Sequence, residues 1–249
     1  MKKHQLFIGF FLVAALAVIF SVSLIVRAYE TAATTKMINA KQPKIVFIGW
    51  DSAAKNYSIV QDFRSTVNYR QADEKTGHVV NLGNGNLTVG RGNETIWQSP
   101  ADWWVSGYAL ADANHDGKTE LNLNVWKPGD FGPSKPAWVK ENDLSVKNHL
   151  FVYELGADGV KALWQSSNLD RPTCEFIFAD LDGDTKQELG VIEGEYTTER
   201  FCRGKFVAVW KWDEWGFYNQ WRSPDGHYND LRVAESGGKK FLQAAMLSQ

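Results

Sequence analysis

The chain has 249 residues, of which 44% are hydrophobic and 13% aromatic, and its formal net charge is −2. This apolar content excludes a disordered tail, because such segments bury too little apolar surface to fold. The sequence has no long basic block after its N-terminus to bind phosphates, so we expect no nucleic-acid partner.

Residues 1–27 have the pattern of a membrane anchor. A basic start, "MKKHQ", precedes an uncharged run from Leu6 to Val26, and Arg27 closes it. At about 1.5 Å per helical residue the run spans roughly 30 Å, the hydrocarbon thickness of a bilayer. The lysines of the basic start favour a cytoplasmic N-terminus, which predicts a single-pass protein of the cell membrane with the rest of the chain outside the cytoplasm. A cleaved signal peptide is the alternative.

Residues 28–42 are small and polar without an apolar period, and they are typical of a tether. From residue 43 to residue 249 the chain alternates short strand-like segments, such as "KIVFIGW", "ELNLNVW" and "KFVAVWKW", with turns rich in Gly, Asn, Asp and Pro. No long helical period interrupts them, so we expect an all-β extracytoplasmic domain over 43–249.

The strands repeat as a set. The tag "WQS" occurs at Trp97–Ser99 and Trp164–Ser166, and "WRS" occurs at Trp221–Ser223. Four strands in about 60 residues match one blade of a β-propeller, a four-stranded antiparallel sheet. We expect a small closed propeller in which "DLRVAE" and "KKFLQAAML" join the strands "NLTVGR" and "ETIWQS". The alternative is a partial propeller whose edge strands pair with another chain, as in a homo-oligomer.

Two acidic loops lie between strands of successive repeats. "DANHDGKTEL" begins at Asp112 and "DLDGDTKQEL" begins at Asp180, and both place oxygen-bearing side chains at positions 1, 3, 5 and 9. Such oxygens, with a carbonyl from position 7, favour calcium. The second loop has four carboxylates against three, which predicts tighter binding there. A pair of Asx turns without a metal is the alternative.

The loop pattern D-x-[DN]-x-D-G-x-x-[DE]-L between two strands resembles the FG-GAP repeats of integrin α-subunit heads and their bacterial relatives. The first loop matches throughout, whereas the second has its glycine at position 4 rather than 6. The resemblance covers about Trp97 to Ser223 and implies a propeller stabilised by two Ca²⁺ ions. The ligands that it implies are Asp112, Asn114, Asp116, the Lys118 carbonyl and Glu120 in the first loop, and Asp180, Asp182, Asp184, the Lys186 carbonyl and Glu188 in the second. His115 is expected to face solvent.

The two cysteines fall at the same end of one predicted sheet, because Cys174 begins its first strand and Cys202 lies just before its third strand. Their separation would be about 10 Å, whereas a disulfide needs Cα atoms within about 7 Å. The loop Thr198–Arg203 would have to fold over the middle strand. We expect the disulfide to form in an exported domain, with two free thiols as the alternative.

The tryptophans give the best indication of function. The sequence has neither G-x-S-x-G nor H-E-x-x-H, so no catalytic residue is assigned. Aromatic packing between blades is one explanation of the tryptophan content, and an aromatic platform for a sugar ring or a protein partner is the alternative. The candidates for that platform are Trp104, Trp126, Trp138, Trp212 and Trp215. The sequence therefore predicts a membrane-anchored binding module for a glycan or protein, and a cell-envelope polysaccharide lyase or hydrolase on the same scaffold is the alternative.

Overall fold

The computed structural model describes residues 44–60, 67–69, 77–129, 135–141, 143–156, 159–198 and 201–247. All of them belong to one unit, Pro43–Gln249. The predicted anchor, 1–27, and tether, 28–42, lie outside the described residues. Within the described part of the chain, no helix is long and apolar enough to cross a bilayer.

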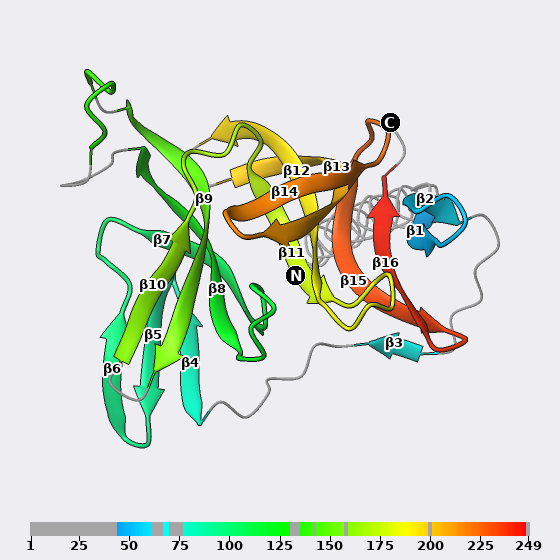
Figure 1. Cartoon of the computed structure of the whole chain (residues 1–249). Helices are drawn as coiled ribbons and strands as arrows, with labels where there is room; N and C mark the ends of the chain where they lie inside the picture. Colours follow the sequence, from blue (N-terminus) through cyan, green and yellow to red (C-terminus); the bar gives the residue numbers. More distant parts are fainter. Residues whose placement is uncertain are drawn as a thin grey trace, which may run out of the picture. The chain divides into compact units, whose positions relative to one another are not determined.

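The described residues form strands arranged in four antiparallel sheets, which confirms the all-β prediction (Figure 1). Two of these sheets are four-stranded meanders of consecutive strands, as the sequence repeat predicts. The first has the order β10-β9-β8-β7 and the second the order β11-β12-β13-β14. The strands of the first are β7 (Trp104–Ala111), β8 (Glu120–Gly129), β9 (Asp143–Gly156) and β10 (Gly159–Gln165). Those of the second are β11 (Thr173–Ala179), β12 (Glu188–Thr198), β13 (Phe201–Asp213) and β14 (Gly216–Arg222).

The tag serines make the same backbone contact in three sheets, so the repeat in the sequence corresponds to a repeat in the structure. A third sheet, of order β4-β5-β6, contains β4 (His78–Gly83), β5 (Asn86–Arg91) and β6 (Glu94–Gln98). After β6, β10 and β14 the tag serine clamps the chain to the neighbouring strand. Its N–H donates to a carbonyl there, and its hydroxyl oxygen accepts the N–H of the same residue. The clamped pairs are Ser99 with Leu87, Ser166 with Leu150, and Ser223 with Val207.

The fourth sheet joins the two ends of the described chain and corrects one prediction. Its order is β2-β1-β16-β15-β3. "DLRVAE" and "KKFLQAAML" do form neighbouring strands, but they join "KIVFIGW" and not "NLTVGR" or "ETIWQS". The strands are β1 (Lys44–Asp51), β2 (Asn56–Val60), β3 (Val67–Tyr69), β15 (Tyr228–Ser236) and β16 (Lys239–Met246).

Burial explains this pairing. Val46 and Ile48 of β1 lie opposite Ala244 and Leu242 of β16, and all four are in the buried core. Leu87 of "NLTVGR", in contrast, is buried against the β7–β10 sheet. Each apolar strand face therefore pairs where a second sheet can cover it.

Three hydrophobic clusters connect the four sheets in a row. One joins the β4–β6 sheet to the β7–β10 sheet, the second joins the β7–β10 and β11–β14 sheets, and the third joins the β11–β14 sheet to the terminal sheet. Among the described residues, no such cluster joins the terminal sheet to the β4–β6 sheet. The row of described sheets is open, which agrees with the partial arrangement and not with the closed ring.

The predicted disulfide between Cys174 and Cys202 is present, with Cα atoms 5.6 Å apart. The pairing of β11 with β12 shifts register between Thr173 and Glu175, so Cys174 lies at a bulge. The bridge lies against Gly194 of the intervening strand β12, where a Cβ would come within 2.5 Å of the Cys174 Sγ. Bulged strands and a missing side chain thus bring the two cysteines closer than regular strand spacing predicts.

Candidate metal centres

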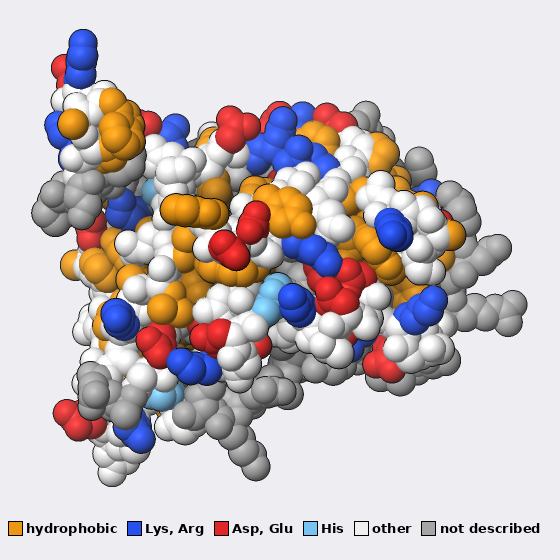
Figure 2. Space-filling view, viewed as in Figure 1, with side chains coloured by type: hydrophobic (Ala, Val, Ile, Leu, Met, Phe, Trp, Pro, Cys, Tyr) orange, Lys and Arg blue, Asp and Glu red, His pale blue; other side chains and the backbone are white. Residues whose placement is uncertain are grey.

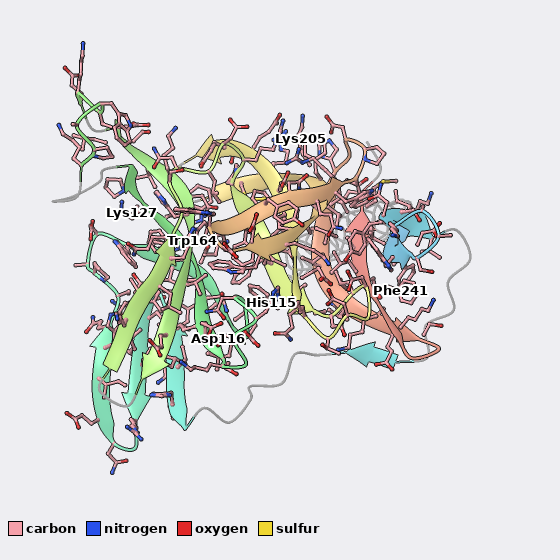
Figure 3. All side chains as sticks on the ribbon, viewed as in Figure 1. His115, Asp116, Lys127, Trp164, Lys205 and Phe241 are labelled. Atoms are coloured by element: carbon pink, nitrogen blue, oxygen red, sulfur yellow. A yellow bond between two sulfur atoms is a disulfide. The ribbon has the colours of Figure 1, made fainter. Side chains whose placement is uncertain are left out.

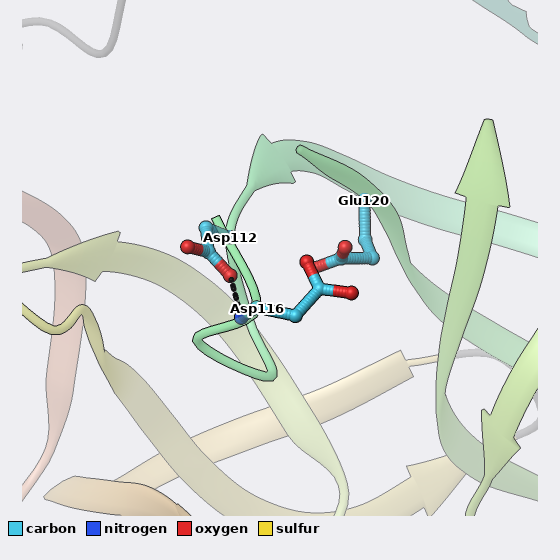
Figure 4. A group of neighbouring side chains, drawn as sticks. All are labelled: Asp112, Asp116 and Glu120. Atoms are coloured by element: carbon cyan, nitrogen blue, oxygen red, sulfur yellow. Dashed lines mark hydrogen bonds between the residues drawn. The ribbon is translucent and has the colours of Figure 1, made fainter. Parts of the chain in front are cut away.

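The first acidic loop connects β7 to β8 and gathers three carboxylates. Oxygen atoms of Asp112, Asp116 and Glu120 lie within 4.8 Å of one another, and we call this group site 1 (Figure 4). The Asp112 carboxylate accepts the N–H groups of Asp116 and Gly117, at 3.1 and 3.0 Å. These bonds curl the loop around the first aspartate, so that the carboxylates converge.

The other predicted ligands of the first loop lie beside site 1. The Asn114 side-chain oxygen accepts the Asp116 N–H at 3.0 Å, and the Asp116 carboxylate accepts the Lys118 N–H at 2.9 Å. The Lys118 side chain extends to Glu154, 3.5 Å away. The amide oxygen of Asn114 and the carbonyl of Lys118 remain predicted ligands.

Glu120 is the buried member of site 1. It is 1% exposed, and its Oε2 accepts the Ala113 N–H at 2.8 Å. Burial is the largest effect that raises the pKa of Glu120, the carboxylates of Asp116 and Asp112 add to it and the Ala113 N–H opposes it, and together they raise the pKa to about 7. Clustered carboxylates of this kind favour a bound cation, which removes their mutual repulsion.

The second acidic loop connects β11 to β12 and repeats the arrangement. Oxygen atoms of Asp180, Asp182 and Glu188 lie within 4.8 Å of one another, and we call this group site 2. Asp180 accepts the N–H groups of Gly183 and Thr185, at 2.8 and 3.2 Å. Glu188 is 1% exposed and its Oε2 accepts the Leu181 N–H at 2.8 Å, as Glu120 does for Ala113.

Asp184 and Lys186 stand outside the close group of site 2. The Asp184 carboxylate accepts the Lys186 N–H at 2.8 Å, which matches the bond between Asp116 and Lys118 in the first loop. The two loops therefore share the hydrogen bonds from position 2 to position 9 and from position 7 to position 5, whereas position 5 belongs to the close group only in site 1.

The backbone explains the different glycine positions of the two loops. Positions 4 and 6 both have positive φ, at His115 (62°) and Gly117 (85°) in the first loop and at Gly183 (82°) and Thr185 (73°) in the second. Each loop needs two residues in the left-handed region and supplies glycine at one of them. Thr185 is β-branched, so its conformation is strained.

His115 does not face solvent as predicted. It is half-buried, and its Nε2 lies 3.1 Å from the carbonyl oxygen of Gln187 in the second loop. The Gln187 side chain accepts the Asp112 N–H at 3.1 Å. Figure 3 labels His115, and Figure 2 shows a histidine on this face with a lysine or arginine and acidic side chains near it. Gln187 thus couples the two loops, a contact between repeats that neither motif predicts.

Site 2 also contains a lysine from β13. The Lys211 Nζ lies 2.5 Å from Asp182, 3.3 Å from Glu188 and 3.6 Å from Asp184. Its side chain is 19% exposed. Burial is the largest effect that raises the pKa of Glu188, Asp182 adds to it and the Leu181 N–H and Lys211 oppose it, and together they raise the pKa to about 6. Sequence reasoning missed Lys211, although the tag spacing could have identified it as the counterpart of Glu154 in the first repeat.

The five candidate tryptophans do not share one surface environment. Trp104 and Trp126 are directly opposite in β7 and β8, and both line a pocket of about 580 Å³ together with the disulfide. Trp212 is half-buried and packs against the core together with Trp164 and Phe217. Trp138 and Trp215 are 82% and 88% exposed.

No protein-family model, no curated protein and no solved structure matches this chain. The likeness to FG-GAP repeats therefore rests on the loop motif and the strand repeat alone.

Proposed function

We propose that this protein is a calcium-binding module of β-propeller type, related to the FG-GAP repeats. One observation carries the proposal: two loops at equivalent places in two equivalent sheets each bring three carboxylates within 4.8 Å of one another. Calcium takes carboxylate, amide and carbonyl oxygens in flexible arrangements, and both loops offer these groups. The metal stabilises the junction between the β7–β10 and β11–β14 sheets, because the loops contact each other through Gln187.

The test is calorimetric titration of the full-length chain with Ca²⁺. Asp116→Asn should remove one binding event, because it neutralises an exposed carboxylate of site 1 and keeps its size. The matched control is Asp102→Asn, an exposed aspartate outside both loops. Absence of calcium binding by the wild-type chain would refute the proposal.

The module also binds a glycan outside the cytoplasm, held at the membrane by residues 1–27. The pocket beside Trp104 and Trp126 supports this part. Its volume of about 580 Å³ is in the range of small-molecule sites. Trp104 packs on Gly85, where a Cβ would come within 2.3 Å of the indole. Thr173 and Glu175 add polar groups to the pocket lining. A concave pocket with an aromatic wall and polar edges favours a sugar over a flat protein surface.

Retention on cell-envelope polysaccharide tests the glycan. Trp104→Ala should lose retention, whereas Trp138→Ala, at an exposed position outside the pocket, should keep it. Release of shortened polysaccharide would instead identify a lyase or hydrolase. Binding to a protein but to no polysaccharide would refute the glycan.

A further inference from the structure

The two repeats differ in charge at one equivalent position beside the metal loops. In the first repeat Leu121 is opposite Tyr153, and Glu120 is opposite Glu154. In the second repeat Leu189 is opposite Trp210, so the next residue, Lys211, takes the place of Glu154. The tag pairs give the same alignment, because Leu150 and Val207 are the clamped residues of the two sheets.

This difference gives site 2 an internal cation. The Lys211 ammonium contacts three carboxylates, those of Asp182, Glu188 and Asp184, from a side chain that is 19% exposed. At site 1 the equivalent Glu154 adds a negative charge and draws Lys118 towards itself. Among the described residues, Asp116 is the site 1 carboxylate that forms an ion pair. Its partner is Lys118, whose Nζ lies 4.0 Å away and whose side chain is 66% exposed.

One buried oxygen atom indicates that the lysine does not complete site 2. The hydroxyl of Tyr57 is buried and makes no hydrogen bond, whereas the Oε1 of Glu188 lies 3.3 Å from the Lys211 Nζ. Tyr57 is 2% exposed, and the carboxylates of Glu188, Asp182 and Asp184 all act on its hydroxyl. Buried polar groups are normally satisfied, so the Tyr57 hydroxyl points to a cation site that can take an ion with more ligands than an ammonium, which has three donors.

We propose that Lys211 is the built-in cation of site 2, which holds the second loop together without metal and competes with calcium for it. Calcium then binds first at site 1, and a divalent ion enters site 2 only after the ammonium has moved out. This order is the reverse of that predicted by counting carboxylates, because one lysine cancels the fourth acid and must also leave before the ion enters. The competition with calcium rests on the proposed function, whereas the structural role of Lys211 does not.

The experiment titrates the full-length chain with Ca²⁺ and, separately, with Tb³⁺. The wild-type chain should show one tight and one weaker calcium site. Lys211→Met should tighten the weaker site by about tenfold or more, because calcium no longer has to displace an ammonium from three carboxylates. It should also lower the melting temperature in chelator, since the carboxylates lose their counter-charge. Glu154→Lys is the reciprocal variant and should weaken site 1.

Terbium luminescence identifies the site. The Trp50 ring centroid is 6.0 Å from the Lys211 Nζ, close enough to sensitise an ion in site 2. The Trp50-dependent emission is the terbium emission that is lost in Trp50→Phe. In the wild-type chain this emission should rise when the second equivalent of Tb³⁺ is added. In Lys211→Met it should rise when the first equivalent is added. Trp50-dependent emission with the first equivalent in wild type would overturn the proposal. That wild-type result decides the question even if Lys211→Met does not fold.

The results separate this inference from the proposed function. Unchanged calcium affinities together with an unchanged melting temperature in Lys211→Met would overturn the role of Lys211 and leave calcium at site 1 intact. No calcium binding by any variant would refute the proposed function and, with it, the competition. In that case a lower melting temperature of Lys211→Met in chelator would still support the structural role, and an unchanged one would overturn it.

Discussion

Glu120→Gln should stabilise the protein without calcium and destabilise it, relative to wild type, with calcium. The glutamine keeps an oxygen that can accept the Ala113 N–H and removes a charge that lies 1% exposed beside Asp112 and Asp116. The metal-free protein loses a buried repulsion, whereas the calcium-bound protein loses a ligand. The two effects have opposite signs, so they separate a metal role from a purely structural one.

The magnitude follows from the shifted pKa. Burial and the neighbouring carboxylates raise the pKa of Glu120 from 4.5 to about 7. The folded protein holds this proton more tightly than the unfolded chain does. The ionisation of Glu120 therefore lowers the free energy of unfolding fully at pH values above the pKa in the folded state. At pH values below the pKa in the unfolded chain, it has no effect. A shift of this size corresponds to at most on the order of 3 kcal/mol. At pH 8 and without metal, we expect the free energy of unfolding of Glu120→Gln to exceed that of wild type by about 1–3 kcal/mol. Each kcal/mol should raise the melting temperature by about 2–4 °C.

The assay is thermal unfolding of wild type and variant at pH 4 and pH 8, in chelator and in millimolar calcium. In chelator the wild type should lose stability between about pH 4.5 and pH 7, and the variant should lose less. Glu154→Gln is the control, since Glu154 lies opposite Glu120 but is 36% exposed. The reasoning is refuted if Glu120→Gln lowers the melting temperature equally at both pH values and calcium stabilises both proteins alike.

Three further changes test the framework of the repeats. Thr185→Gly should add about 1 kcal/mol to the free energy of unfolding in chelator, because glycine adopts a φ of 73° without strain. The control Thr185→Ala should bring little gain. Equal urea midpoints for the glycine variant and wild type would contradict this. Ser223→Ala should lower the free energy of unfolding by about 1–3 kcal/mol, because the buried Val207 N–H loses its acceptor. An unchanged urea midpoint would show that the tag does not clamp the strand. Replacing Cys174 and Cys202 together by alanine should lower the free energy of unfolding by about 3 kcal/mol, because the disulfide closes a loop with a sequence separation of 28. Wild type with its disulfide reduced should unfold at the same urea midpoint as the double variant.

The sequence by itself determined the features that depend on neighbouring residues. Alternating apolar residues predicted the strands, the repeated tags predicted the equivalent sheets, and the acidic loops predicted where carboxylates converge. Each of these patterns lies within a short segment, where backbone geometry relates spacing directly to direction. The disulfide was also within reach, because the repeat placed both cysteines at one end of the same sheet.

Only the tertiary structure decided the partners of these segments. "KIVFIGW" and "NLTVGR" have similar apolar patterns, and which of them pairs with β16 depends on which sheet covers each face. In the same way, Lys211 reaches Asp182 across 29 residues, and Gln187 links two loops from different sheets. Charge and apolar pattern specify that a group needs a partner, but the packing of the sheets selects which partner lies within reach.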